Sequence, residues 1–123
     1  MVKYILGIDE GTTSARAFVM DEDTNVTGFG QAELTQIYPR NGWIEHDPMQ
    51  IWNVQLEVIR AALRDAGITP DQLSGVGLTN QRETGIVWEK ETGRPIFNAI
   101  VWASRHSVDI VQGWIDQGIG DLI

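Results

Sequence analysis

The chain opens with three apolar runs that predict β-strands, at Tyr4–Ile8, Ala15–Met20 and Val26–Leu34. Short runs rich in β-branched and aromatic residues, separated by polar stretches, are typical of strands. Because the connections between these runs are short, we expect the strands to form an antiparallel meander. The following segment, Tyr38–Asp47, has neither a helical nor a strand period, and we expect it to be an irregular connection.

The pattern then changes to that of an amphipathic helix. Asp47 and Pro48 are preferred at the N-cap and the first helical position, and Gly67 is preferred just after a helix end. Between them, apolar residues recur at spacings of three and four, which predicts one stripe facing the core. The stripe consists of Trp52, Leu56, Ile59, Leu63 and Ala66.

The second half of the chain predicts shorter elements. Thr69–Leu73 has the pattern of one helical turn, and Val76–Asn80 is typical of a buried parallel strand. Two further apolar runs, Gly85–Trp88 and Ile96–Ala99, flank a polar stretch and predict a hairpin closed through Gly93.

A last helix is predicted near the end of the chain, capped by Ser104 and ended by Gly118. Val108, Val111 and Ile115 would face inward. The predicted order β-β-β-α-β-β-β-α indicates an α/β fold with a mixed sheet and helices packed on its faces.

Composition adds mainly exclusions. The 123 residues suffice for one domain with a core, and nine basic against seventeen acidic residues give a net charge of −8. This balance argues against a nucleic-acid partner, because phosphate backbones are bound by clustered Lys and Arg. The chain has no cysteine, no signal-peptide pattern and no apolar stretch of the roughly 20 residues that a membrane span requires. We therefore expect a cytoplasmic protein without a membrane span.

The turn after the first strand is the first candidate site. It reads Asp9-Glu10-Gly11-Thr12-Thr13-Ser14. Glycine accepts backbone angles closed to other residues, so main-chain N–H groups and hydroxyls can converge there on an anion such as phosphate. Asp9 could hold the Mg²⁺ that accompanies a nucleotide, directly or through water. An ordinary hairpin with a polar turn is the alternative.

The loop Asn80–Thr84 is the second candidate site. Arg82 offers a fork of donors and Glu83 offers acceptors, which together suit the hydroxyls of a small polyol. Trp102 could form an apolar wall for the carbon side of such a ligand. The alternatives are a solvated loop and a core tryptophan. His46 and His106 lack metal-ligand spacing, and His46 is interpreted as part of the start of the helix.

Several segments resemble known kinases. Asp9–Arg16 resembles the phosphate hairpin shared by sugar kinases, heat-shock ATPases and actin. Four further segments, in this order and spacing, resemble the glycerol kinases of the FGGY family of carbohydrate kinases. These segments are Gln36–Pro39, Gly42–Pro48, Asn80–Thr84 and Asn98–Trp102.

The resemblance implies a ribonuclease-H-like domain of the actin and sugar-kinase type, with residues 1–123 as the N-terminal part of its first domain. It implies phosphate contacts from four residues of the turn, an Mg²⁺ site near Asp9, and glycerol or a similar polyol as the acceptor. The phosphate residues are Thr12, Thr13, Ser14 and Arg16, beside Gly11; the polyol residues are Arg82, Glu83 and Trp102.

The implied activity is ATP-dependent phosphorylation of glycerol to sn-glycerol 3-phosphate by a full-length protein, expected to be a homo-oligomer. The general base and a second domain are expected beyond Ile123, so the fragment alone is expected to be inactive. Two alternatives stay open. One is an FGGY kinase for another small polyol or dihydroxyacetone, and the other is a non-catalytic actin-like nucleotide-binding module.

Overall fold

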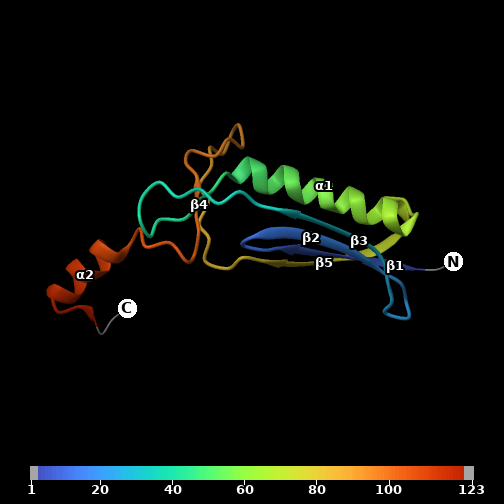
Figure 1. The fold of residues 1–123 in the computed structure, drawn as a ribbon, viewed down its shortest axis with the longest axis horizontal. Coiled ribbons are helices and arrows are strands. Elements are labelled where there is room, and N and C mark those ends of the chain that lie inside the picture. The colour runs from blue at the N-terminus through green and yellow to red at the C-terminus, as the bar shows by residue number, and fades with distance from the viewer. Residues whose placement is uncertain (1–2, 121–123) are drawn as a thin grey trace.

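A four-stranded sheet with one long helix along it forms the body of the molecule (Figure 1). The computed structural model describes residues 3–120. Strands β1 (Tyr4–Glu10), β2 (Ser14–Met20) and β3 (Val26–Glu33) pair as the predicted antiparallel meander. Strand β5 (Leu73–Asn80) pairs in parallel with β1, which gives the order β3-β2-β1-β5. The predicted α/β fold with a mixed sheet is thus confirmed.

Helix α1 (Pro48–Ala66) begins and ends where the sequence predicts. The side chain of Asp47 accepts a hydrogen bond from the backbone N–H of Met49 at 2.8 Å and so caps the first turn. At the other end Gly67 has the left-handed backbone (φ 66°) that favours glycine. The short 3₁₀ turn predicted after it is present at Pro70–Gln72.

The helix lies unusually close to the sheet because two glycines of β3 face it. A Cβ at Gly28 would stand 2.3 Å from the carbonyl oxygen of Ala62, and one at Gly30 would stand 2.3 Å from that of Val58. Val58 and Ala62 therefore pack directly on the small and branched residues of the sheet. The core consists of Leu6, Ala15, Ala17, Val19, Val58 and Ala62.

Two predictions about burial are wrong. Trp52 belongs to the predicted core stripe, yet it is 59% exposed, and the buried residues of α1 are Gln55, Val58 and Ala62. Strand β5 is parallel as predicted but not buried, since Leu78 is 71% exposed. The reason is the position of α1, which contacts β2 and β3 extensively and leaves β5 uncovered.

A second, small sheet lies at the N-terminal end of α1. Strand β4 (Glu45–His46) pairs antiparallel with β6 (Ala99–Ile100). The segment predicted to be irregular therefore contains a strand. The predicted hairpin closes through Gly93, with the Glu89 N–H donating to the Arg94 carbonyl, but only isolated bridges flank it, because β6 pairs with β4 instead.

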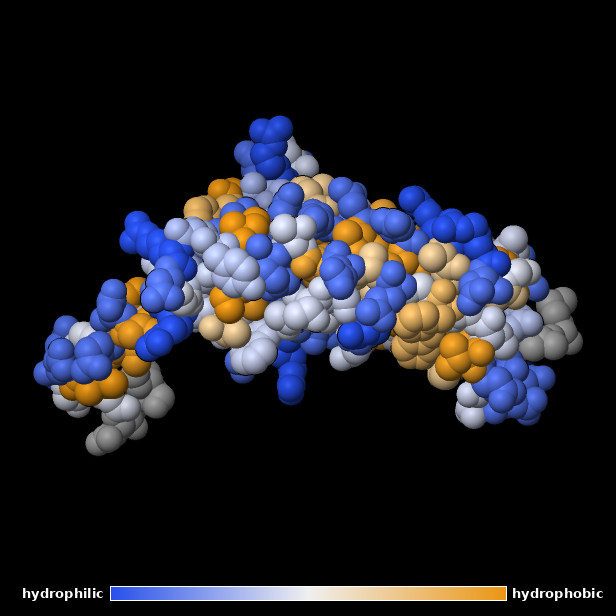
Figure 2. Space-filling view, viewed as in Figure 1, coloured by the Kyte–Doolittle hydropathy of each residue, from blue (hydrophilic) through white to orange (hydrophobic). Residues whose placement is uncertain are grey.

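Helix α2 (Val108–Asp116) stands apart from the sheet (Figure 1), and apolar atoms show on its surface in Figure 2. The sequence predicted that Val108 and Ile115 would face a core, but they are 43% and 48% exposed. Ser104 does not cap this helix; Ser107 occupies the N-cap position. No helix within residues 3–120 combines the length and apolar character needed to cross a bilayer.

Candidate functional site

The turn between β1 and β2 is closed by its own backbone. The N–H of Gly11 donates to the carbonyl of Ser14 at 3.2 Å. A Cβ at Gly11 would stand 2.7 Å from that same oxygen, closer than such contacts allow. A residue with a side chain would therefore force the turn open, which explains the glycine.

Three consecutive carbonyls of the turn are held by donors from other parts of the chain. Gln81 Nε2 donates to Gly11 O at 3.2 Å, Gln36 Nε2 donates to Thr12 O at 3.0 Å, and the Leu34 N–H donates to Thr13 O at 2.9 Å. None of the peptides within the described residues is cis. A trans peptide points its N–H opposite to its carbonyl. The N–H groups of Thr12, Thr13 and Ser14 therefore each point away from the donor that holds the carbonyl of the same peptide, and are not used by these contacts.

Asp9 and Arg16 pair with each other across β1 and β2. The distance from Arg16 Nη1 to Asp9 Oδ2 is 2.8 Å, and the two side chains are about one-third exposed (38% and 33%). A pair this exposed contributes little to stability, so both groups remain available to a ligand. No group of three metal-binding side chains occurs within residues 3–120, so Asp9 would hold Mg²⁺ mainly through water and phosphate oxygens.

The turn and the Asn80–Thr84 loop open onto one shared hollow of about 460 Å³. Thr12 lies on one side and Arg82, Glu83 and Trp102 on the other. Trp102 is 57% exposed, so it is not a core residue. Its indole Nε1–H donates to Thr12 Oγ1 at 2.9 Å, which joins the two sides directly.

The remaining residues of the turn face a second hollow, of about 340 Å³. Thr13, Ser14 and Arg16 line it together with Gln31, Glu33, Leu34 and Gln36. The structure therefore brings Thr12 together with the predicted polyol residues, whereas Thr13, Ser14 and Arg16 line a separate hollow, and Asp9 and Gly11 line neither of the two.

Glu83 has a strained backbone at the edge of the first hollow. Its φ of 67° lies in the left-handed region, which only one other non-glycine residue adopts within residues 3–120, namely Thr24 in a surface turn. Such a conformation costs a residue with a Cβ about 1–2 kcal/mol. Strain of this kind is concentrated at functional sites, which supports a ligand-binding role for Glu83.

Glu10 adds a partly buried carboxylate behind the turn. Burial raises the pKa of this carboxyl above its ordinary value, the hydrogen bond from Gln81 Nε2 (2.9 Å) opposes the shift, and the negative charge of Asp9 adds to it. Glu10 accepts from the same amide group that holds the carbonyl of Gly11.

The polar residues that support the site were not predicted as such from the sequence. Gln36, Gln81 and Thr84 lie in the segments Gln36–Pro39 and Asn80–Thr84 but had no role assigned, and His46 was interpreted as part of the helix start. His46 is fully buried and contacts both glutamines. His46 lies in the two-residue strand β4, and its partners are 10 and 35 positions away in the sequence. No local pattern predicts hydrogen bonds between residues so far apart.

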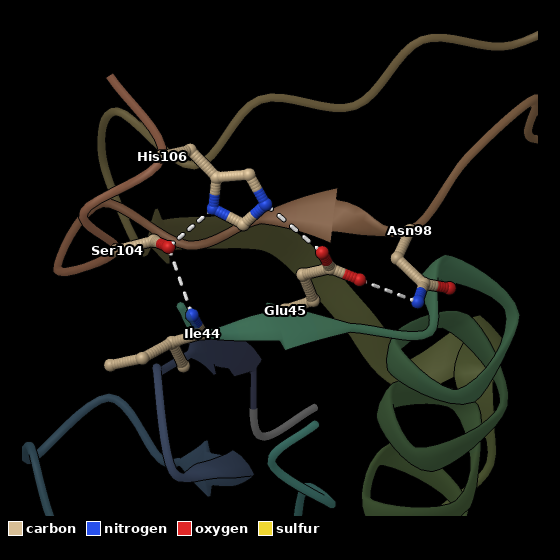
Figure 3. Close-up of polar contacts among 5 residues, drawn as sticks. All are labelled: Ile44, Glu45, Asn98, Ser104 and His106. Atoms are coloured by element: carbon tan, nitrogen blue, oxygen red, sulfur yellow. Dashed lines mark hydrogen bonds and ion pairs between the residues drawn. The ribbon is translucent and has the colours of Figure 1, made fainter. Parts of the chain in front are cut away.

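A second polar cluster connects β4 with the segment after β6 (Figure 3). The His106 ring lies between Ser104 Oγ (2.6 Å from Nδ1) and Glu45 Oε1 (3.0 Å from Nε2). The other oxygen of Glu45 accepts from Asn98 Nδ2 at 2.8 Å, and Ser104 Oγ accepts from the Ile44 N–H at 2.9 Å. Because Glu45 is buried, this cluster fixes the segment that carries Trp102.

Residues 4–123 match the family model for the N-terminal domain of the FGGY family of carbohydrate kinases. The chain belongs to this family. It is 52% identical over 121 residues to a glycerol kinase from Vibrio atlanticus, an alignment that covers 98% of this chain and 24% of the relative. The chain thus spans about a quarter of the length of the curated relatives it matches.

Solved structures agree on the fold of this FGGY domain. A crystal structure of Plasmodium falciparum glycerol kinase with ADP matches 94% of the chain and 23% of that protein, with a TM-score of 0.82 and 31% identity. A gluconate kinase from Lactobacillus acidophilus matches 97% of the chain and 23% of that protein, with a TM-score of 0.85 and 24% identity. The fold is that of the actin-like ATPases, as the sequence predicted.

Proposed function

We propose that a full-length protein containing this chain transfers the γ-phosphoryl group of ATP to a terminal hydroxyl of glycerol. The observation that carries the proposal is the shared hollow, which Thr12 of the phosphate turn lines together with Arg82, Glu83 and Trp102, and in which the Trp102 indole N–H donates to Thr12 Oγ1. A phosphoryl donor and a polyol acceptor have to meet in one such space. The 52% identity to a glycerol kinase supports glycerol as the acceptor.

The residues of the turn fit the phosphate groups. The carbonyls of the turn accept hydrogen bonds from other parts of the chain, so the N–H groups of Thr12, Thr13 and Ser14 point away from those donors. Arg16 lines the same hollow as Thr13 and Ser14 and adds positive charge there. These donors would bind and orient the terminal phosphates of the nucleotide. A Cβ at Gly11 would open this arrangement.

The opposite side of the hollow fits a polyol. The guanidinium of Arg82 would donate to two neighbouring hydroxyls and the carboxylate of Glu83 would accept from them, while the Trp102 ring covers the carbon side. This arrangement would orient one terminal hydroxyl towards the phosphate. Transfer then depends mainly on positioning and charge stabilisation.

Mg²⁺ is compatible with Asp9, which offers one accessible carboxylate beside the turn. When bound, the ion offsets the negative charge of the phosphate oxygens. We further propose that residues 1–123 form the N-terminal part of the first of two domains, with the general base in the remaining sequence. Cytoplasmic location and homo-oligomerisation stay predictions, to be tested by cell fractionation and light scattering.

The proposal is tested by measuring ADP formation by the full-length protein with glycerol, erythritol, dihydroxyacetone, xylulose and gluconate as acceptors. We expect glycerol to give the highest kcat/KM. Replacing Arg82 by Ala should raise the KM for glycerol at least tenfold, because a bidentate charge-assisted contact is worth about 1.5–3 kcal/mol. Arg60→Ala, an exposed arginine of α1, serves as the matched control. No ADP formation with any acceptor would contradict the proposal.

A further inference from the structure

His46 is the largest fully buried side chain of the molecule as described, with no exposed surface. It lies on β4, outside both hollows, and neither of its ring nitrogens contacts a charged group. Nε2 lies 2.9 Å from Gln36 Oε1, and Nδ1 lies 3.4 Å from Gln81 Nε2. The histidine thus bridges two glutamines that come from opposite halves of the chain.

The hydrogen-bond partners determine which nitrogen of His46 carries the proton. The amide nitrogen of Gln36 donates to two carbonyls, Thr12 O and Leu34 O (3.1 Å), so its oxygen must face His46. An amide oxygen only accepts, so Nε2 of His46 is the protonated nitrogen. The amide nitrogen of Gln81 has two protons for three acceptors, namely Glu10 Oε1 (2.9 Å), Gly11 O (3.2 Å) and His46 Nδ1 (3.4 Å), so Nδ1 accepts the longest of these contacts as a shared bond. Burial lowers the pKa of His46, which favours the same neutral form.

Both glutamines act on the phosphate turn. Gln36 holds the carbonyl of Thr12, and Gln81 holds the carbonyl of Gly11. Because each peptide is trans and planar, the direction of these two carbonyls determines the direction of the N–H groups of Thr12 and Thr13. Any rotation of either glutamine amide would therefore turn a donor that the phosphate needs.

Gln81 also contacts the polyol side of the hollow. Its Oε1 accepts from Thr84 Oγ1 at 2.9 Å, and Thr84 Oγ1 accepts from the Trp102 N–H at 3.3 Å. The Trp102 indole returns to Thr12 Oγ1. Hydrogen bonds therefore connect His46 to both sides of the hollow through one residue, Gln81.

We propose that His46 is a positioning residue which, as the neutral Nε2–H tautomer, locks Gln36 and Gln81 and thereby aims the Thr12 and Thr13 N–H groups at the phosphates of the nucleotide. This inference rests on the proposed function of the turn. His46 itself touches no substrate. Its role is to preorganise the two N–H donors, those of Thr12 and Thr13, that contact the phosphates. Preorganised donors stabilise developing charge without reorganisation during the reaction.

The first test compares two replacements of His46 in the full-length protein. In His46→Gln a side-chain amide can still donate to Gln36, whereas His46→Leu keeps the volume and removes both bonds. We expect His46→Leu to raise the KM for ATP about tenfold, equivalent to about 1.4 kcal/mol, with the KM for glycerol changed by less. We expect His46→Gln to restore most of the ATP affinity.

The matched control is Arg60→Ala, an exposed arginine of α1 that lines neither hollow. It should leave the KM for ATP unchanged. Gln36→Leu is a second variant for the case in which His46→Leu does not fold, and it should raise the KM for ATP by a similar factor. An unchanged KM in His46→Leu or Gln36→Leu, or equal damage in His46→Gln and His46→Leu, would overturn the inference.

A readout without catalysis separates this inference from the proposed function. In the ¹⁵N-labelled full-length protein, the His46 ring should show a protonated Nε2 and an unprotonated Nδ1. The amide signals of Thr12 and Thr13 should shift in His46→Gln less than in Gln36→Leu. The opposite tautomer would overturn the inference even in an active enzyme. The expected spectra in a protein that phosphorylates no polyol would support the inference on the turn and refute the proposed function alone.

Discussion

The close contact between α1 and β3 makes Gly30→Ala a sharp test of the fold beneath the site. The added Cβ would stand 2.3 Å from Val58 O and 3.0 Å from the Cβ of Ala61. The oxygen belongs to the helix backbone, so no side-chain rotation relieves the overlap. Helix and strand must separate by about 1 Å to restore a normal contact, and overpacking of this kind costs about 1–3 kcal/mol.

Moving α1 away from the sheet should also disturb the site, because Gln55 of α1 donates to the carbonyl of Arg16 at 3.3 Å. We expect urea unfolding to give a free energy of unfolding about 1–3 kcal/mol lower for Gly30→Ala than for the native protein. Gly77→Ala is the matched control, since a Cβ there meets no atom within 4 Å. It should be neutral or stabilising by about 0.4–1 kcal/mol. Equal stability of the two variants would refute the reasoning.

Three further predictions concern the polar groups of the site. Trp102→Phe and Thr12→Val should couple by about 0.5–1 kcal/mol in a double-mutant cycle of unfolding free energies; strict additivity would contradict the hydrogen bond between them. Because burial raises the pKa of Glu10 above 4.5, its contribution to stability is complete below about pH 4.5 and lost as the pH rises through the folded-state pKa. The stability of Glu10→Gln relative to the native protein, measured by urea unfolding, should therefore increase from about pH 4 to pH 7, and a constant difference would contradict the buried carboxylate. Glu45→Ala removes a buried carboxylate that accepts from two partly buried donors, and should lower the free energy of unfolding by about 1–3 kcal/mol, whereas Glu57→Ala on the exposed side of α1 should change it little.

The sequence predicts the elements of this fold better than their burial. Caps at Asp47 and Gly67 are local signals, and the structure confirms both. Ile59, Leu63 and Ala66 of the predicted stripe pack against the core, but Trp52 does not, and Gln55 is buried instead, where its amide donates to a backbone carbonyl. A polar residue with such a partner interrupts the apolar stripe, and hydropathy then favours Trp52, which is exposed.

Burial of β5 was predicted wrongly for a different reason. The apolar run around Val76 and Leu78 fits a strand covered on its faces, but α1 covers β2 and β3 instead. An apolar pattern states what a strand can bury. It does not state which element lies over it.

The site shows the same division between local and distant information. The motifs at Gly11–Ser14 and Arg82–Glu83 are local, and the sequence predicted both as ligand-binding residues. Their supports depend on contacts between distant residues, such as Gln81 with Gly11 and His46 with Gln36. No spacing in the sequence predicts these bonds, because they exist only once β4 and β5 lie beside the turn.

The indole N–H of Trp102 reports on both ligands at once, since it donates to Thr12 of the phosphate turn and Trp102 lines the same hollow as the polyol residues. In the full-length protein labelled with ¹⁵N-tryptophan, ADP and glycerol are titrated separately. We expect each ligand to shift the Trp102 indole signal, while that of Trp52, exposed on α1, stays in place. A Trp102 signal that responds to neither ligand, or to only one of them, would contradict a single hollow shared by nucleotide and polyol.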